Sequence, residues 1–239
     1  MKNREKDIER IISRFSEENI KLEKHRFSRK IVFWQSFINF SYRLKRFLDF
    51  LLAFLAILLL SPVFIITAIL IVIEDPGPIT YSQPRVGKDG KLFNFYKFRS
   101  MIVGADKMKD ELLDSNESKD GVIFKMKDDP RITKVGKFIR KYSIDELPQL
   151  INVLKGEMSM VGPRPPVPRE VNLYTLEDRK RLHIKPGITC IWQVAGRSEI
   201  PFKEQVELDK RYIRSQSFWE DLKILLLTIP AVLTGKGAY

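Results

Sequence analysis

The sequence has few of the side chains that form crosslinks or zinc sites: one cysteine, Cys190, and two histidines, His25 and His183, among 239 residues. A single cysteine excludes an internal disulfide framework and is typical of a reducing compartment. So few cysteine and histidine side chains also disfavour a zinc site of the usual Cys/His kind. We therefore expect neither disulfides nor zinc to organise this chain.

Acidic residues are the scarcer charged class. The chain has 30 Asp and Glu against 42 Lys and Arg, which gives a net charge of +12 and a pI near 9.7. This excess predicts an anionic partner, which can be nucleic acid, anionic lipid headgroups or a phosphate-bearing substrate. None of the basic residues lies in a recognisable DNA- or RNA-binding motif with interleaved aromatic residues. Lipid and phosphate substrate are therefore the favoured partners.

Charge is absent altogether from Phe50 to Ile73, an apolar run with Ser61 and Pro62 at its middle. A helix of about 20 apolar residues can cross the hydrocarbon layer, so the run predicts a membrane helix. It begins too far from Met1 and is too long for a cleaved signal peptide, so we expect it to be retained. Pro62 has no N–H to donate to the carbonyl group of Leu58, which predicts a kink or a break in the helix.

Two membrane geometries fit this run: a kinked span, or a helix-break-helix hairpin that enters and leaves the membrane on the same face. Basic residues prefer the cytoplasmic side of a membrane. Both flanks of the run are basic, with cations at Arg43, Lys45, Arg46, Arg85, Lys88, Lys91, Lys97 and Arg99. A hairpin keeps both flanks on one side, whereas a span separates them. The charges therefore favour the hairpin, and a span with a tolerated proline stays the alternative.

The rest of the chain predicts an α+β domain that is mostly helical. Alternating residues over 79–83 and 92–98, with a glycine-rich turn between them, predict a small strand pair. We expect helices over 132–142, 144–154 and 202–233, the last region holding two helices, and a mobile polar segment over 104–120. The final helix, interrupted by Pro230, is expected to lie against the membrane or the core.

Before the apolar run, residues 1–42 form a charged extension. Ile8, Ile11, Ile12 and Phe15 have helical spacing, so a surface helix competes with a loosely ordered chain. The aromatic-rich stretch Ile31–Tyr42 is expected to lie in the membrane interface. Asp49, at the mouth of the run, is expected to pair with an arginine, because an unpaired carboxylate there is costly.

The candidate chemical centre is the pair of adjacent carboxylates Asp145 and Glu146. A purely structural explanation exists, since Ser143 and Glu146 match a capping box. Pro148 argues against it, because proline is tolerated in the first turn of a helix and not beyond, which favours Asp145 as the cap. Asp145 would then be ionised at the positive end of a helix, close to where a phosphate is attracted. Two such carboxylates near Arg140 suit a nucleophile together with a metal or proton handler.

Three further sets of cations are candidates for phosphate binding. Prolines fix the backbone on both sides of Arg164, so its planar guanidinium is well placed for bidentate binding of phosphate. A proline-rich ligand for a partner domain is the alternative for that segment. Lys97 and Arg99 end a predicted strand, either as a charged strand end or as an anion site. Arg197 lies at the tip of another predicted loop.

Six motifs occur in a fixed order along the chain: Lys45-Arg46-Phe-Leu-Asp49, Ser61-Pro62, Lys97-Phe-Arg-Ser-Met101, Asp145-Glu146-Leu-Pro-Gln-Leu150, Gly162-Pro-Arg-Pro165 and Pro186-Gly-Ile-Thr189. Together they resemble the bacterial sugar transferase family, the monotopic polyprenyl-phosphate phosphoglycosyl transferases that prime polysaccharide and glycan assembly. The resemblance covers about Tyr42 to the C-terminus. Long members carry a further membrane bundle and a nucleotide-fold domain, so this chain resembles a short form. Cys190 replaces a common glycine, which affects only the local turn.

The resemblance implies transfer of a sugar phosphate from a UDP-sugar to undecaprenyl phosphate or another polyprenyl phosphate. It implies that Asp145 attacks the sugar-proximal phosphorus, which releases UMP and leaves a covalent phosphosugar on the enzyme. It also implies Mg²⁺ at Asp145 and Glu146, with Glu146 holding the metal or handling a proton. The side chains expected to bind phosphate or substrate are Arg140, Arg164, Lys97, Arg99 and Arg197.

The resemblance further implies a membrane-associated enzyme with a re-entrant helix over 43–75, which turns at Ser61 and Pro62, and a cytoplasmic catalytic domain over 76–239. The expected location is the cytoplasmic face of the bacterial inner membrane. The implied partners are a UDP-sugar, polyprenyl phosphate, membrane lipids and downstream glycosyltransferases, without nucleic acid.

Two other classes of function fit parts of the sequence. One is a membrane-tethered scaffold whose proline-rich segment recruits a partner. The other is a basic nucleic-acid binder, which steeply salt-dependent affinity would reveal.

Overall fold

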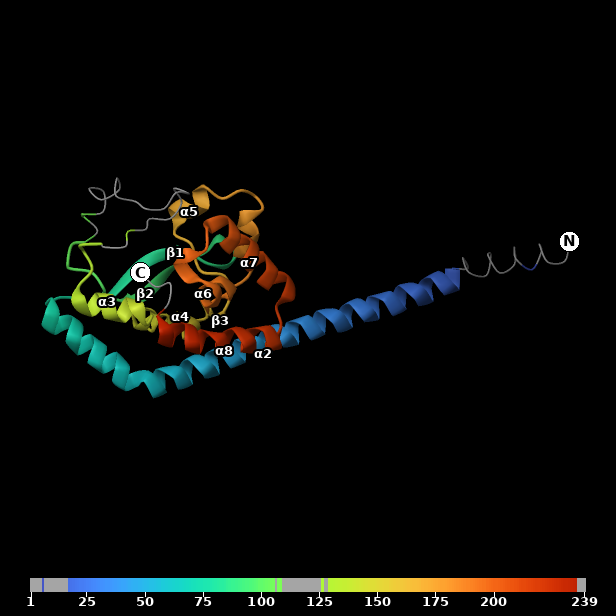
Figure 1. Cartoon of the computed structure of the whole chain (residues 1–239). Helices are drawn as coiled ribbons and strands as arrows, with labels where there is room; N and C mark the ends of the chain where they lie inside the picture. The colour runs from blue at the N-terminus through green and yellow to red at the C-terminus, as the bar shows by residue number, and fades with distance from the viewer. Residues whose placement is uncertain (1–5, 7–16, 106, 109–125, 127–128, 236–239) are drawn as a thin grey trace. The chain divides into compact units, whose positions relative to one another are not determined.

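The computed structural model describes residues 6, 17–105, 107–108, 126 and 129–235, which Figure 1 shows in colour. The chain divides into two units, Met1–Phe47 and Leu48–Tyr239. Helix α2, Glu17–Glu74, contributes residues to both units. The surface helix expected around Ile8 to Phe15, and most of the polar segment over 104–120, lie outside the described residues.

The N-terminal unit is helical wherever it is described, from Glu17 to Phe47. The ring of Trp34 lies edge-on to those of Phe33 and Phe37, with centroids 6.3 and 6.1 Å apart. Large apolar side chains along this helix are mostly exposed. The aromatic stretch expected at the membrane interface is therefore a helix with exposed aromatic rings, and its membrane position stays a prediction.

Helix α2 continues through Pro62, and Figure 1 shows it bent within the part coloured from cyan to teal. The Ser61 hydroxyl group donates a hydrogen bond of 2.9 Å to the carbonyl oxygen of Leu58. This is the carbonyl that Pro62 leaves without its usual N–H donor. Serine thus compensates for proline, and the helix bends without ending.

Among the described residues, α2 is the one helix that could cross a membrane by its length and composition. Its most apolar stretch of 18 residues has a mean hydropathy of 3.0, and 11% of that stretch is buried. Apolar side chains that the protein itself does not cover need another apolar environment. The helix is therefore consistent with membrane association.

In the C-terminal unit, α2 packs on both sides of Pro62. Before the proline, Ala53 joins a buried cluster with Phe95, Leu150, Val153 and Met158. After it, Ile71 joins a second cluster with Phe98 and Ile139, and Phe64 packs against both clusters. The two halves of the apolar helix therefore share one folded unit.

Polar contacts fix both ends of this apolar stretch. Asp49 accepts a hydrogen bond from the backbone amide of Met160 at 3.0 Å. Glu74 accepts hydrogen bonds from the backbone amides of Lys134 and Val135 at 2.7 and 2.8 Å. The pairing of Asp49 with an arginine, expected from the sequence, stays a prediction.

Strands β1, Thr80–Val86, and β2, Leu92–Phe98, form the predicted antiparallel pair. Gln83 lies opposite Phe95, and Arg85 lies opposite Phe93. Directly opposite residues point to the same face of a pair, and the side-chain period of a strand is two. Arg85, Phe95 and Lys97 therefore share one face of this ribbon.

A second strand pair was not predicted from the sequence. Strands β3, Ser159–Val161, and β4, Gly187–Thr189, are parallel. A Cβ atom at Gly187 would lie 2.0 Å from the backbone nitrogen of Gly162, so only glycine allows the two chains to approach this closely. The expectation of one small strand pair was therefore incomplete, although the α+β class is correct.

Helices make up most of the remaining fold. They are α3 (Lys134–Lys141), η3 (Ile144–Glu146), α4 (Gln149–Lys155), α5 (Pro168–Asn172), η4 (Asp178–His183), α6 (Ile191–Ala195), η5 (Arg197–Glu199), α7 (Phe202–Ser215) and α8 (Phe218–Thr234). The helices predicted over 132–142 and 202–233 are confirmed. Helix α8 runs through Pro230, where an interruption was expected, and Ile224 anchors it to a core cluster with Val161 and Tyr212.

Candidate active site

The two candidate carboxylates lie in one short turn. Asp145 and Glu146 belong to η3, and Ser143 before them has a φ of 53°, a left-handed conformation with no side-chain cap. Helix α4 begins after Pro148, not at Asp145. The segment therefore folds as a 3-10 turn followed by a separate helix. The prediction of one helix over 144–154 with Asp145 as its cap is wrong. The alternative, a capping box at Ser143, is wrong as well.

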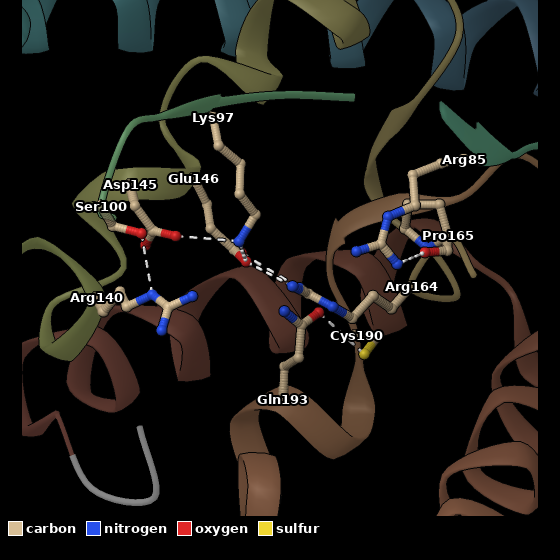
Figure 2. A network of polar contacts seen from close by, with 10 residues as sticks. All are labelled: Arg85, Lys97, Ser100, Arg140, Asp145, Glu146, Arg164, Pro165, Cys190 and Gln193. Carbon is tan, nitrogen blue, oxygen red and sulfur yellow. Dashed lines mark hydrogen bonds and ion pairs between the residues drawn. The ribbon is translucent and has the colours of Figure 1, made fainter. Parts of the chain in front are cut away.

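Lys97 connects the two carboxylates (Figure 2). Its ammonium nitrogen lies 3.0 Å from Oδ2 of Asp145 and 2.8 Å from Oε1 of Glu146. Asp145 is buried and Glu146 is nearly so, with side chains 6% and 14% exposed. One ammonium group is therefore shared by two adjacent carboxylates away from bulk water, where the attraction is stronger than at an exposed surface.

Arg164 approaches Glu146 from the proline-rich loop with both terminal nitrogens. Nη2 lies 2.7 Å from Oε1, and Nη1 lies 3.3 Å from Oε2. Burial alone would raise the pKa of Glu146, but Arg164 and Lys97 outweigh it and hold that pKa well below its usual range. Burial likewise opposes the charge of Arg164, and Glu146 outweighs it and raises the pKa of the guanidinium. Glu146 is thus an ionised group at the centre of the site.

Arg140 flanks the cluster from α3, and its Nε donates a hydrogen bond of 3.0 Å to Oγ of Ser100 (Figure 2). Helix α3 approaches the Ser100 backbone closely, since a Cβ at Gly136 would lie only 2.0 Å from the Ser100 oxygen. We did not single out Ser100 from the sequence. Its position directly after Arg99 in the strand-end motif was the available signal.

Arg99 does not join the cluster. Its guanidinium is buried and binds Asp75 through both the carboxylate, at 3.3 Å, and the backbone carbonyl group. The Arg99 guanidinium thus binds Asp75 rather than the carboxylate pair, and its assignment to phosphate stays a prediction.

Arg197 lies in η5 with a φ of 52°, and its Nη1 is 3.5 Å from the carbonyl oxygen of Lys141. Burial lowers the pKa of Arg197, and the charges of Glu146 and Asp145 partly oppose this. The structure therefore brings Arg197 within the electrostatic reach of the two carboxylates, although no direct bond joins them among the described contacts.

Among the described hydrogen bonds, Cys190 bonds to Gln193 and not to either carboxylate of the site. Its thiol group is buried and donates to Oε1 of Gln193 at 3.1 Å. Burial raises the pKa of this thiol well above its ordinary value, so it stays protonated at neutral pH. Figure 2 shows the Gln193 side chain beside Arg164, a neighbour that the sequence did not single out.

The carboxylate pair fits a magnesium ion better than a metal that needs a cage of protein ligands. The described residues contain no group of three or more His, Cys, Asp or Glu side chains that could hold a metal. Mg²⁺ is usually held by one or two carboxylates, with water and substrate phosphates completing its shell. Asp145 and Glu146 already share one cation, the ammonium group of Lys97.

The site is a largely buried cluster of two carboxylates and their cationic partners on an α+β unit, and the comparisons identify the family. The chain belongs to the bacterial sugar transferase family, whose model matches residues 40–235. It is 50% identical over 213 residues to the galactosyl transferase CpsE of Streptococcus agalactiae serotype III, covering 87% of this chain and 46% of that protein.

Two other relatives support the same family assignment. The chain is 44% identical over 202 residues to the undecaprenyl-phosphate galactose phosphotransferase of Salmonella typhimurium, covering 82% of this chain and 42% of that protein. It is 41% identical over 198 residues to the exopolysaccharide production protein ExoY of Sinorhizobium fredii, covering 82% of this chain and 88% of that protein. The chain thus spans less than half the length of the longer relatives and most of the shorter one.

Proposed function

We propose that this protein transfers a sugar 1-phosphate from a UDP-sugar to polyprenyl phosphate, the priming step of polysaccharide or glycan synthesis. One observation carries the proposal: cations from three separate elements, Lys97, Arg140 and Arg164, surround the adjacent carboxylates of Asp145 and Glu146. The relatives named for undecaprenyl-phosphate sugar transfer support the same reaction.

In the first step, an Oδ atom of Asp145 attacks the sugar-proximal phosphorus of the UDP-sugar. A new P–O bond forms to the carboxylate, and the bond from that phosphorus to the bridging oxygen breaks. UMP leaves with the electron pair of that oxygen, and an aspartyl phosphosugar remains. An anionic nucleophile approaches an anionic substrate here, so Arg140, Arg164 and Lys97 must neutralise the phosphoryl oxygens.

In the second step, an oxygen of polyprenyl phosphate attacks the same phosphorus. The bond to Asp145 breaks, the carboxylate is regenerated, and polyprenyl diphosphate sugar leaves. Glu146 is ionised before substrate binds, because Arg164 and Lys97 outweigh its burial and hold its pKa low. Its role is therefore that of a fixed negative charge that orients cations, rather than that of a proton donor at neutral pH.

Mg²⁺ is part of the proposal, held by Asp145 and Glu146 and by the substrate phosphates, where it would supply charge neutralisation. Lys97 would then exchange its carboxylate partners for phosphate oxygens. The test is removal of divalent ions with EDTA. We expect loss of UMP release and its recovery on adding MgCl₂, and full activity in EDTA would contradict the magnesium role.

We also propose that the apolar part of α2 is re-entrant and that the catalytic unit lies on the cytoplasmic face of the inner membrane. Nucleotide sugars are made in the cytoplasm, and a site at headgroup level can reach a lipid phosphate whose tail stays in the bilayer. The bend at Ser61 and Pro62 and the basic flanks support this geometry. Downstream glycosyltransferases are the proposed consumers of the product.

The deciding experiment is a UMP-release screen over a panel of UDP-sugars with polyprenyl phosphate as acceptor. Wild-type protein incubated with the active UDP-sugar and no lipid should gain the mass of one phosphosugar. Asp145→Asn should abolish both signals. Full turnover by Asp145→Asn would exclude the covalent mechanism, and no UMP release from any UDP-sugar would favour the membrane-tethered scaffold.

A further inference from the structure

One face of the β1–β2 ribbon carries a second cation, Arg85, that the proposed reaction does not use. The guanidinium carbon of Arg85 lies 5.2 Å from the ring centroid of Phe95, and the ammonium nitrogen of Lys97 lies 5.8 Å from the same centroid. Phe95 is 2% exposed and belongs to the buried cluster that contains Ala53, so it is a fixed support for both cations. Lys97 reaches the carboxylates, which leaves the purpose of Arg85 open.

The loop that carries Arg164, residues 162–166, is held mostly by hydrogen bonds between its backbone and the backbone of neighbouring segments. The Gly162 amide donates to Thr189 at 3.0 Å, and the carbonyl groups of Pro163 and Pro166 accept from the Gly187 and Val86 amides, both at 2.9 Å. The carbonyl group of Pro165 differs, because it accepts from Nη1 of Arg85 at 3.0 Å. Among the described contacts of this loop's backbone carbonyls, this is the one made by a side chain.

The positive charges of Arg85 and Arg164 also affect this contact. Burial, and then the nearby charge of Arg164, lower the pKa of Arg85 to about 10, which still leaves it protonated at neutral pH. Its buried Nε has no hydrogen-bond partner among the described residues. Figure 2 shows Arg85 beside the Arg164 loop while the Arg164 guanidinium extends away toward Glu146. Repulsion between the two guanidinium groups therefore favours the extended position of Arg164.

We propose that Arg85 is a positioning residue for Arg164. The Arg85 guanidinium lies over the fixed Phe95 ring and donates to the Pro165 carbonyl group, and so sets the point from which Arg164 reaches Glu146 and the substrate phosphate. Arg85 is thus linked to Lys97 in two ways. One runs through the Pro165 carbonyl group, Arg164 and Glu146, and the other through the Phe95 ring on which both cations lie. The inference rests on the proposed function, because a phosphate is the ligand for which Arg164 is positioned.

The test compares Arg85→Met and Arg85→Lys with wild type, using a UDP-sugar that wild type turns over. Displacing a catalytic group by about 1 Å costs on the order of 100-fold, so Arg85→Met should lower kcat by about 10- to 100-fold with KM changed less than about threefold. Arg85→Lys should recover part of the loss, because an ammonium group can still donate to Pro165. Arg169→Met is the matched control: Arg169 is exposed in α5 and should leave kcat unchanged.

Two readouts separate positioning from other roles. In an Arg164→Met background, adding Arg85→Met should change kcat by less than about twofold, since its route to the substrate is already lost. The ¹⁵Nε–H resonance of Arg164, assigned by its absence in Arg164→Lys, should shift toward its exposed value in Arg85→Met protein without substrate.

A rise in KM at unchanged kcat, additive losses in the double variant, or an unmoved Arg164 resonance would each overturn the inference. If Arg85→Met does not fold, Arg85→Lys in the same cycle decides. Absence of turnover by wild type would instead count against the proposed function, and the resonance shift would still test the positioning.

Discussion

Glu146 is the residue at which most of the site's charge converges. Arg164 and Lys97 both bind its carboxylate at 2.7 to 2.8 Å, and its side chain is 14% exposed. Removing one partner from such a cluster leaves the others near one another without compensation. The carboxylate therefore contributes to stability as well as to chemistry, and its contribution depends on its being ionised.

Glu146→Gln should lower the free energy of unfolding by about 1–3 kcal/mol at pH 7. The folded-state pKa of Glu146 is depressed below the ordinary value of 4.5, so the stabilising contribution is present above about pH 4.5 and is lost as pH falls toward the folded pKa. Thermal unfolding of wild type and Glu146→Gln should therefore differ by a constant amount from pH 6 to 8 and converge at lower pH. A difference that grows on acidification would contradict the ion-pair explanation.

Gly136 decides how closely α3 can approach the site. A Cβ there would lie 2.0 Å from the Ser100 oxygen and 2.8 Å from its carbonyl carbon, and backbone atoms cannot move aside cheaply. In an unconstrained helix, Gly→Ala stabilises by about 1 kcal/mol. Here Gly136→Ala should instead destabilise by about 1–3 kcal/mol and lower kcat, because α3 must shift and carries Arg140 with it.

The expected loss of stability in Gly136→Ala is opposite in sign to the usual effect of Gly→Ala in a helix, so the two explanations can be told apart. Chemical denaturation of Gly136→Ala and of Lys137→Ala, on the exposed side of the same helix, supplies the measurement. Lys137→Ala should change stability by less than about 0.5 kcal/mol. If Gly136→Ala proves more stable than wild type, the close contact with Ser100 does not exist.

At the scale of elements, α2 and α3 are joined by Glu74. Its carboxylate accepts from the Lys134 and Val135 amides, while the Thr133 hydroxyl accepts from the Gly136 amide at 2.9 Å. The first three amides of α3 are thus satisfied, two of them by the last residue of α2. Burial raises the pKa of Glu74, and these hydrogen bonds together outweigh it and lower the pKa overall.

Glu74→Gln should therefore act as the loss of a helix cap, at a cost of about 1 kcal/mol. Because α3 carries Arg140 in its last turn, kcat should fall by a few-fold as well. Thermal unfolding and UMP release measure the two effects. Glu207→Gln is the control, since the Glu207 side chain is 62% exposed and forms an ion pair with Lys210, far from α3 in the sequence. Equal effects from both variants would show that Glu74 does not cap α3.

Some of the helices and strands could be predicted from the sequence, and others could not. The β1–β2 pair and helices α3, α7 and α8 were predictable, because each carries a periodic pattern over seven or more residues. Strands β3 and β4 have three residues each and are brought together from distant parts of the chain, so no local pattern reveals them.

Among the site residues, Asp145 and Glu146 were predictable from their motif. Their 3-10 turn was not, because Pro148 fits more than one helix start. Arg85 was seen only as a flanking charge, since its partner is a carbonyl group 80 residues away.

For the whole molecule, the contacts that hold the two ends of the apolar run support an expectation about the membrane geometry. A straight helix over Phe50–Ile73 at about 1.5 Å per residue would be long enough to cross a hydrocarbon layer of about 30 Å. A span would place Asp49 and Glu74 at opposite membrane surfaces. Yet both carboxylates accept backbone hydrogen bonds from one folded unit, at Met160 and at Lys134 and Val135.

A unit with charged surfaces cannot hold both ends of a spanning helix without itself crossing the hydrocarbon, which would leave its polar groups unsatisfied. We therefore expect both flanks of the run on one side of the membrane. Arg43→Cys and Lys91→Cys, each with Cys190→Ser to remove the native thiol, place a reactive group before and after the run. In intact cells an impermeant maleimide should label neither position, and after permeabilisation it should label both, which also confirms that the sites are accessible. Labelling of one position alone in intact cells would establish a span, and the hydrogen bonds at Asp49 and Glu74 could not then coexist in the membrane-bound protein.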